Sequence, residues 1–134
     1  MEVKVSQIEG VKFDIQARSH KITCDQPAEN GGADSGMTPP ELLLASLGSC
    51  AAFYAAEYLR TRKLAQSGVE VSVTAEKLLN PARLGDFHVM VTSPVALTAE
   101  QTESMMRCVH SFLVHNTLIS LPAIKIEIAA GVLQ

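Results

Sequence analysis

Apolar side chains at every second position predict short β-strands in the first part of the chain. These positions are Val3 and Val5, then Phe13, Ile15 and Ala17, then Ile22 and Cys24. A period of two places side chains on one face of a strand. Glu9-Gly10 and Arg18-Ser19 provide turns between the strands, and residues 25–37, rich in Gly, Asp and Asn, predict a loop.

A long helix is predicted to begin directly after this loop. Thr38 is suited to cap the helix, Pro39 to be its first residue, and Glu41 to complete a Thr-x-x-Glu capping box. The helical pattern continues to about Lys63, and its central part is apolar nearly all round, which predicts burial on most sides. Because one small sheet cannot cover so many apolar sides, we expect an obligate homodimer with helix-to-helix contact at its centre.

The second half of the chain predicts a strand pair, a helix and a last strand. Residues 69–76 alternate with period two, Phe87, Val89 and Val91 mark the second strand, and Asn80-Pro81 and Gly85-Asp86 lie between the two. A second capping box, residues 98–101, opens a helix expected to carry Met105, Met106, Val109, Phe112 and Leu113. After Pro122, alternating Ile124, Ile126 and Ile128 predict the last strand. This order of elements indicates an α+β fold.

The composition limits the class of protein. With 134 residues, of which 47% are hydrophobic and 19% charged, the chain has the length and balance of a single domain, residues 1–134. The net charge is −3 and Lys and Arg are not clustered, so nucleic-acid binding is not expected. The apolar run 42–56 is shorter than the ~20 residues of a membrane crossing, and the N-terminus does not resemble a signal peptide. We therefore expect a cytoplasmic protein that does not bind a membrane.

The three cysteines offer candidate chemistry without a metal or a cofactor. Cys24, Cys50 and Cys108 are far apart, and none has a Cys or His at zinc-ligand spacing. In the cytosol such thiols are reduced. Cys50 lies among small residues and shares its helical face with a mostly apolar set of side chains, which suits an apolar substrate. A buried, unreactive thiol fits the same pattern. Reactivity requires a cation from elsewhere in the fold, for which Arg is the natural choice.

Two stretches of the chain resemble one protein family. The first is Asp25-Gln26-Pro27 followed by the run from Gly31 to Cys50, GGADSGMTPPELLLASLGSC. The second is Val114-His115-Asn116-Thr117-Leu118 with Pro122 and the isoleucine strand. Both resemble the osmotically inducible protein C (OsmC-like) family, which includes organic hydroperoxide resistance (Ohr) proteins. The resemblance covers residues 25–130.

This resemblance implies an intertwined homodimer with two long central helices and with active sites at the subunit interface. It also implies a thiol peroxidase. The first cysteine, here Cys50, attacks an organic hydroperoxide and becomes a sulfenic acid, and a second cysteine resolves it to a disulfide. An external dithiol, often a lipoyl group, then reduces the disulfide. An Arg and a Glu hold the reactive sulfur as a thiolate.

The chain departs from the family pattern at the other site positions. The usual slot of the resolving cysteine holds Phe112, and Cys108 lies one helical turn earlier on the expected helix, either as the resolving thiol or as a core residue. Glu41 stands nine residues before Cys50, where the family has its Glu ten before, so it faces away from Cys50 and its default role is the capping box.

Two further residues have open roles. Arg18 is the nearest counterpart of the family's arginine, and a solvated turn residue fits it equally well. His115, seven residues after Cys108, is suited to assist proton transfer or to be a hydrogen-bonded residue at a helix end.

Three hypotheses follow. The first is a peroxidase with Cys50 as nucleophile, acting with Cys108 or with an external thiol alone. The second is a dimer that binds a small apolar or thiol-bearing ligand at its interface without turnover. The third is a purely structural dimer with a buried thiol.

Overall fold

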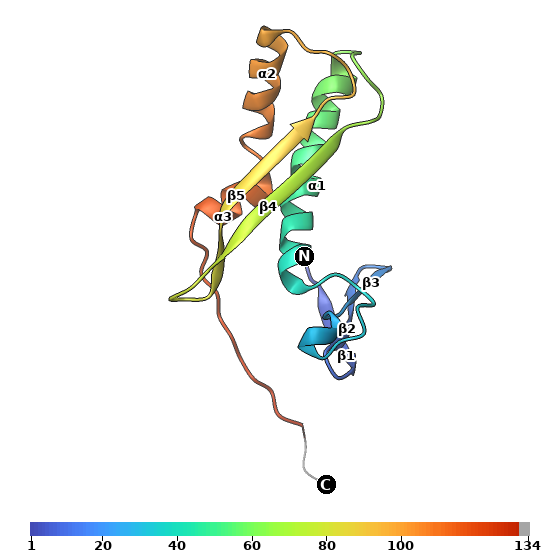
Figure 1. Ribbon diagram of the computed structural model, residues 1–134, viewed down its shortest axis with the longest axis vertical. Helices are drawn as coiled ribbons and strands as arrows, with labels where there is room; N and C mark the ends of the chain where they lie inside the picture. The colour runs from blue at the N-terminus through green and yellow to red at the C-terminus, as the bar shows by residue number, and fades with distance from the viewer. Residues whose placement is uncertain (132–134) are drawn as a thin grey trace.

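The computed structural model describes residues 1–131 and begins with a three-stranded antiparallel sheet. Its strands are β1 (Lys4–Glu9), β2 (Lys12–Ala17) and β3 (His20–Cys24), in the order β1-β2-β3. The strands and both turns expected from the period of two are therefore confirmed. In Figure 1 this sheet lies beyond the first turn of the long helix α1, away from the other strands.

A buried carboxylate organises the loop between β3 and α1. Asp25 accepts hydrogen bonds from the backbone N–H groups of Gln26 (2.8 Å), Ala33 (3.1 Å) and Ser35 (3.0 Å), and from the Ser35 hydroxyl (2.7 Å). The short helix η1 (Ala28–Asn30) lies within this loop. At Gly32 a side chain would overlap the Gln26 carbonyl, which explains the glycine. The loop is thus fixed from within by one acceptor group.

The long helix α1 (Pro39–Thr61) starts where the sequence predicts and ends two residues before Lys63. Both halves of its capping box are present, with the Glu41 side chain on the Thr38 backbone N–H and the Thr38 hydroxyl on the Glu41 N–H. By length and composition alone α1 is also apolar enough to cross a membrane, and a core helix of a folded domain has the same composition. Its burial is less complete than expected, because one face, with Phe53 62% exposed, is open.

The hairpin of β4 (Glu70–Leu78) and β5 (Arg83–Thr92) packs against α1. The two strands are longer than expected. Of the two residue pairs expected between them, Asn80-Pro81 lies in the connection. Gly85-Asp86 was expected between the strands but lies within β5, opposite a register shift between Thr74 and Glu76. Asp86 has a positive φ of 51°. An irregular residue of this kind is accommodated inside a strand as a bulge.

The expected second helix is two helices. α2 (Ala99–Val109) begins with the capping box of Thr98 and Gln101, as predicted, and α3 (Leu113–Ile119) follows after a break. Phe112 has extended backbone angles and precedes α3, so it does not continue α2. The Asn116 side chain donates to the Ser111 carbonyl in the connection (3.3 Å). This local bond supports the break. No Gly or Pro marks the break in the sequence.

The last expected strand does not form within the chain. Residues 121–131 have no regular secondary structure, and Ile124, Ile126 and Ile128 are 79%, 84% and 94% exposed. A strand needs a neighbour to satisfy its backbone N–H and C=O groups, and this segment has none among residues 1–131. The prediction is therefore wrong for a single chain. In Figure 1 the segment runs away from the remaining elements.

The hydrophobic core lies between α1, the β4–β5 hairpin and α2. Its buried residues are Leu47, Ala51, Ala55, Tyr58, Leu59, Met105, Val109 and Phe112. The valines of β4 and β5 that face α1 cover it from the other side. Strands β1–β3 form no substantial packing contact with any other strand or helix of the described chain. The α+β class is confirmed, and the first sheet stands apart from the core.

Replacing Asp25 by Asn is expected to destabilise the fold. The Ser35 hydroxyl, together with the Ser35, Gln26 and Ala33 N–H groups, lowers the pKa of the Asp25 carboxyl far below its ordinary range. A depressed carboxyl pKa stabilises the folded state above the ordinary Asp pKa, and that contribution is lost as the pH falls through the folded pKa. The free energy of unfolding of Asp25→Asn should therefore be lower than that of the wild type at pH 7, and the difference should shrink below about pH 4.

Urea unfolding at several pH values measures this difference. Asp34→Asn is the matched control, because Asp34 is exposed in the same loop, makes no side-chain hydrogen bond within residues 1–131, and has a positive φ that Asn tolerates. Equal stability of Asp25→Asn and Asp34→Asn at pH 7 would contradict the role of this carboxylate.

Candidate functional site

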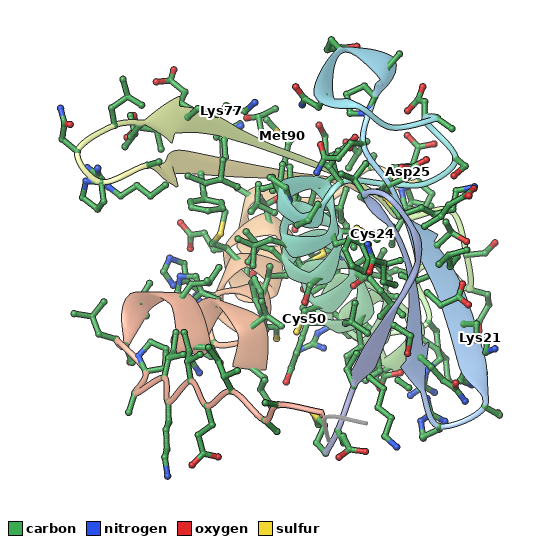
Figure 2. All side chains as sticks on the ribbon, turned by 90° about the horizontal axis from the view of Figure 1, so that it is seen from below. Lys21, Cys24, Asp25, Cys50, Lys77 and Met90 are labelled. Carbon is green, nitrogen blue, oxygen red and sulfur yellow. The ribbon has the colours of Figure 1, made fainter. Side chains whose placement is uncertain are left out.

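Cys50 lies at the middle of α1, half-buried, with its side chain packed against the hydrophobic core (Figure 2). All three cysteines are free thiols; Cys24 is fully buried, and Cys108 is half-buried like Cys50. The thiol of Cys50 makes no hydrogen bond with a side chain in residues 1–131. A half-buried thiol against an apolar wall is accessible to a small reagent, as nucleophilic chemistry requires.

Within residues 1–131, neither Arg18 nor Arg60 of the same chain lies beside this thiol. Arg18 is exposed in the turn between β2 and β3 (φ 54°), in the sheet that does not pack on α1. On α1 itself, Arg60 is paired with Glu57 at 2.9 Å and lies ten residues beyond Cys50, or about 15 Å along the helix axis. Within the described chain, Arg18 and Cys50 are therefore not brought together.

Cys108 is placed on the same core as Cys50 by a different helix. It lies near the end of α2, which packs against α1, and both thiols contact the one hydrophobic cluster. The break after Val109 removes the helical relation expected between Cys108 and Phe112, because the two do not share a helix. His115 lies on α3, so it does not share a helix with Cys108 either, and the expected seven-residue relation between the two does not hold.

Glu41 is occupied at the start of α1. The Thr38 backbone N–H (3.0 Å) and hydroxyl (2.7 Å) both donate to the Glu41 carboxylate and lower the pKa of this carboxyl. The side chain borders a groove on α1 that does not include Cys50. The two residues therefore lie on different faces of the helix, as the spacing predicts.

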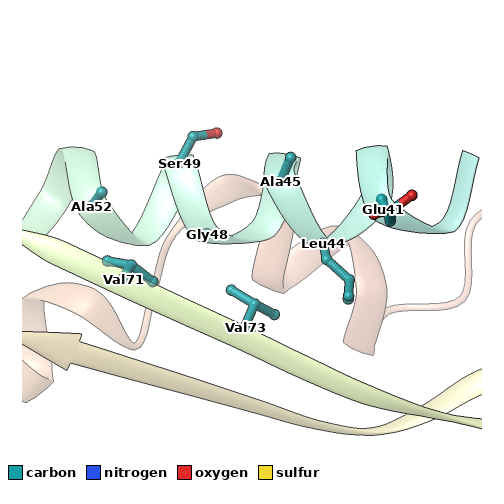
Figure 3. A pocket seen from close by; sticks show the side chains of 8 residues that line it. All are labelled: Glu41, Leu44, Ala45, Gly48, Ser49, Ala52, Val71 and Val73. Atoms are coloured by element: carbon teal, nitrogen blue, oxygen red, sulfur yellow. The ribbon is translucent and has the colours of Figure 1, made fainter. Parts of the chain in front are cut away.

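This groove runs between the first half of α1 and β4 and has a volume of about 440 Å³. It is lined by Glu41, Leu44, Ala45, Gly48, Ser49, Ala52, Val71 and Val73. Figure 3 shows Gly48 and Leu44 on the side of α1 that faces Val71 and Val73, while Ala45 and Ser49 point away from the strand. The groove has both polar and apolar lining residues, and it lies on another face of α1 than Cys50.

A chain of aromatic rings connects the Cys50 region of α1 to α3. Tyr54, one turn after Cys50, lies 6.3 Å from Phe112 between ring centroids, and Phe112 lies 5.4 Å from His115. The His115 ring also contacts that of His110 at 5.2 Å. Sequence reasoning missed this arrangement because it depends on the break between α2 and α3.

Family comparison identifies the same part of the chain as the sequence motifs do. The model of the OsmC-like protein family matches residues 31–128, which include Cys50, Cys108 and His115. No curated protein sequence matches the chain.

Solved structures share the fold at low sequence identity. One is a putative osmotic stress induced and detoxification response protein from Psychrobacter arcticus, with a TM-score of 0.78, 20% identity, and coverage of 86% of this chain and 85% of that one. An OsmC-like protein from Mycoplasma pneumoniae has a TM-score of 0.70, 20% identity, and coverage of 90% and 87%. An organic hydroperoxide resistance protein OsmC from Legionella pneumophila has a TM-score of 0.63, 16% identity, and coverage of 90% of both chains.

Gly48 is expected to be required for the packing of α1 on β4. A Cβ at this position would lie 2.9 Å from a methyl group of Val73. The change Gly48→Val should lower the free energy of unfolding by about 1–3 kcal/mol, the usual effect of overpacking. Glu103→Val, at an exposed position inside α2, is the control for helix propensity. Chemical denaturation of both variants measures the difference, and a Gly48→Val protein as stable as the control would refute the close approach.

Proposed function

Because this chain belongs to the OsmC-like protein family, we propose that it is a thiol-dependent peroxidase that reduces organic hydroperoxides with Cys50 as the nucleophile. The observation that carries the proposal is the position of Cys50. It is a half-buried thiol at the centre of α1, inside the family match and against an apolar core. Such a surface suits the hydrocarbon part of an organic hydroperoxide.

The proposed reaction begins at the Cys50 sulfur. The thiolate attacks the terminal oxygen of the hydroperoxide, an S–O bond forms, and the O–O bond breaks. Cys50 becomes a sulfenic acid, and the alkoxide leaves with the electron pair and takes up a proton to become an alcohol. The substrate is reduced by two electrons and the sulfur is oxidised by two.

Cys108 is the proposed resolving thiol. Its attack on the sulfenic acid releases water and forms a disulfide, which an external dithiol, such as a lipoyl group, reduces by exchange. The shared cluster supports this pairing, which needs the two α-carbons within about 7 Å. If Cys108 does not resolve Cys50, the external thiol reduces the sulfenic acid directly. Such a reductant is available in the cytoplasm, the compartment that we propose for the protein.

The second element of the proposal is a homodimer, which is supported by the area that one chain leaves exposed. The chain has an accessible surface of 10362 Å². A compact monomer of 14.4 kDa exposes roughly 6,800 Å². The difference of roughly 3,500 Å² per chain, or roughly 7,000 Å² for two copies, exceeds the roughly 2,000–5,000 Å² of total surface that a typical obligate interface buries, so one chain leaves more than enough surface exposed for such an interface. The uncovered surfaces are the open face of α1, the detached β1–β3 sheet and residues 121–131.

The dimer supplies a source for the missing cation. Since Arg18 does not reach Cys50 of its own chain, we propose that Arg18 of the second copy lies beside Cys50 and favours the thiolate. The detached sheet supports this assignment, because a sheet without core contacts in its own chain is available to pack on another. In this proposal Glu41 has a structural role at the start of α1, where its carboxylate completes the capping box.

A second candidate function is a dimer that binds a small apolar ligand without turnover. Two observations favour it: no side-chain hydrogen bond holds the Cys50 thiol within residues 1–131, and the groove of about 440 Å³ beside β4 does not include Cys50. This function requires no reactive sulfur. Retention of a ligand by a Cys50→Ser variant would distinguish it from the peroxidase.

Peroxide should oxidise Cys50 in preference to the other cysteines. Treatment with cumene hydroperoxide, followed by mass spectrometry of each cysteine, should show Cys50 oxidised at least about 10²-fold faster than Cys24, because only a stabilised and accessible thiolate is fast. Cys50→Ser should abolish consumption of the peroxide, and Cys24→Ser should not change it. Oxidation of Cys50 at the rate of an ordinary free thiol would exclude the peroxidase.

The protein should be a dimer at micromolar concentration in analytical ultracentrifugation. Phe53→Asp places a charge on the open face of α1 and should raise the dissociation constant at least about 30-fold, the effect of losing a hot-spot side chain worth about 2 kcal/mol. Phe87→Asp is the control on the hairpin. A wild-type protein that sediments as a compact monomer would contradict the proposal.

A further inference from the structure

An imidazole nitrogen on α3, the helix that packs against α1, is buried without a hydrogen-bond partner among residues 1–131. Nδ1 of His115 is shielded from solvent and makes no hydrogen bond with any of residues 1–131. Burying a polar atom in this way is unfavourable, and in native proteins such atoms mark bound water, strain or a catalytic role. The remaining contacts of the ring are aromatic, with Phe112 and His110.

The position of His115 relates this nitrogen to the candidate nucleophile. α3 packs on α1, and its Val114 contacts the same hydrophobic cluster as Cys50 and Tyr54. The Phe112 ring contacts both the His115 ring and the Tyr54 ring. Tyr54 lies in the helical turn that follows Cys50, so these two ring contacts connect His115 to that turn. No carboxylate among residues 1–131 hydrogen-bonds Nδ1 of this ring. This nitrogen is therefore not engaged by another group of the described chain.

Peroxide reduction needs a group of this kind. When the sulfur attacks the terminal oxygen, the other oxygen leaves as an alkoxide, which is a strong base in an apolar site. Histidine is the side chain best suited to give up a proton near neutral pH.

We propose that His115 is a catalytic residue that donates the proton to the departing oxygen. As the O–O bond breaks, the imidazolium transfers one proton to the leaving oxygen. The products are the Cys50 sulfenic acid, the alcohol and a neutral imidazole, which regains its proton from solvent. This inference rests on the proposed peroxidase function and adds to it the identity of the proton donor.

Two oxidants with different leaving groups test the proposal. tert-Butyl hydroperoxide releases an alkoxide that needs a proton, whereas peracetic acid releases acetate, which does not. The rate of Cys50 oxidation is measured with both oxidants in the wild type, His115→Gln and His115→Phe. Loss of a proton donor should slow the reaction of tert-butyl hydroperoxide about 10²-fold or more and leave that of peracetic acid within about threefold. His110→Gln, at the exposed neighbouring ring, should change neither rate.

The outcomes separate this inference from the proposed function. An equal loss with both oxidants would show that His115 only supports the structure of the site, and unchanged rates with both would show that it is not involved; either result overturns the proposal. His115→Phe removes the unpartnered nitrogen while keeping a ring against Phe112, so it guards against a His115→Gln protein that fails to fold. If wild-type Cys50 reacts with both oxidants no faster than an ordinary thiol, the peroxidase function itself has failed.

Discussion

Burial of α1 is the constraint on which the rest of this structure depends. The helix is apolar on more faces than the β4–β5 hairpin, α2 and α3 cover. At Gly48 it approaches β4 so closely that a side chain would not fit, and this contact fixes one face of the helix against the core. The opposite face, with Phe53, is left to solvent in a single chain. Hydrophobic burial is the dominant favourable contribution to folding, so this face and the exposed isoleucines after Pro122 strongly favour association.

The same constraint determines what the site lacks. Cys50 lies at the boundary between the covered and the open faces of α1, where it contacts the core on one side and remains accessible on the other. A thiolate there needs a positive charge, and neither Arg18 nor Arg60 of the same chain supplies it. The proposed dimer meets both requirements together, because in it the second copy covers the open face and brings its own detached sheet, with Arg18, to the first copy. The proposed proton donor is different, since His115 is positioned by α3 of the same chain.

The sequence predicts most of the local structure because local signals are strong there. Both capping boxes, at Thr38 and Thr98, start helices where they are expected, and the period of two marks strands β1 to β5. The break between α2 and α3 is not predicted because no Gly or Pro marks it in the sequence, and the bond from Asn116 to the Ser111 carbonyl that supports it is seen only in the structure. The last strand fails for another reason: Ile124, Ile126 and Ile128 have the correct pattern, but pairing requires a neighbouring strand. At the site, the separate face of Glu41 follows from helical spacing and the choice of Cys50 follows from the family resemblance, whereas the ring chain through Phe112 depends on tertiary packing.

The central claim is that the second copy completes the Cys50 site, and subunit complementation tests it most directly. Arg18→Met and Cys50→Ser chains with different tags are co-expressed, and the mixed dimers are isolated and assayed with cumene hydroperoxide. If Arg18 acts across the interface, each variant alone is inactive, and the mixed dimer regains one working site, with about half the wild-type activity. A mixed dimer as inactive as the two parents would show that the arginine and the cysteine must belong to the same chain, or that they do not act together, and would contradict this account.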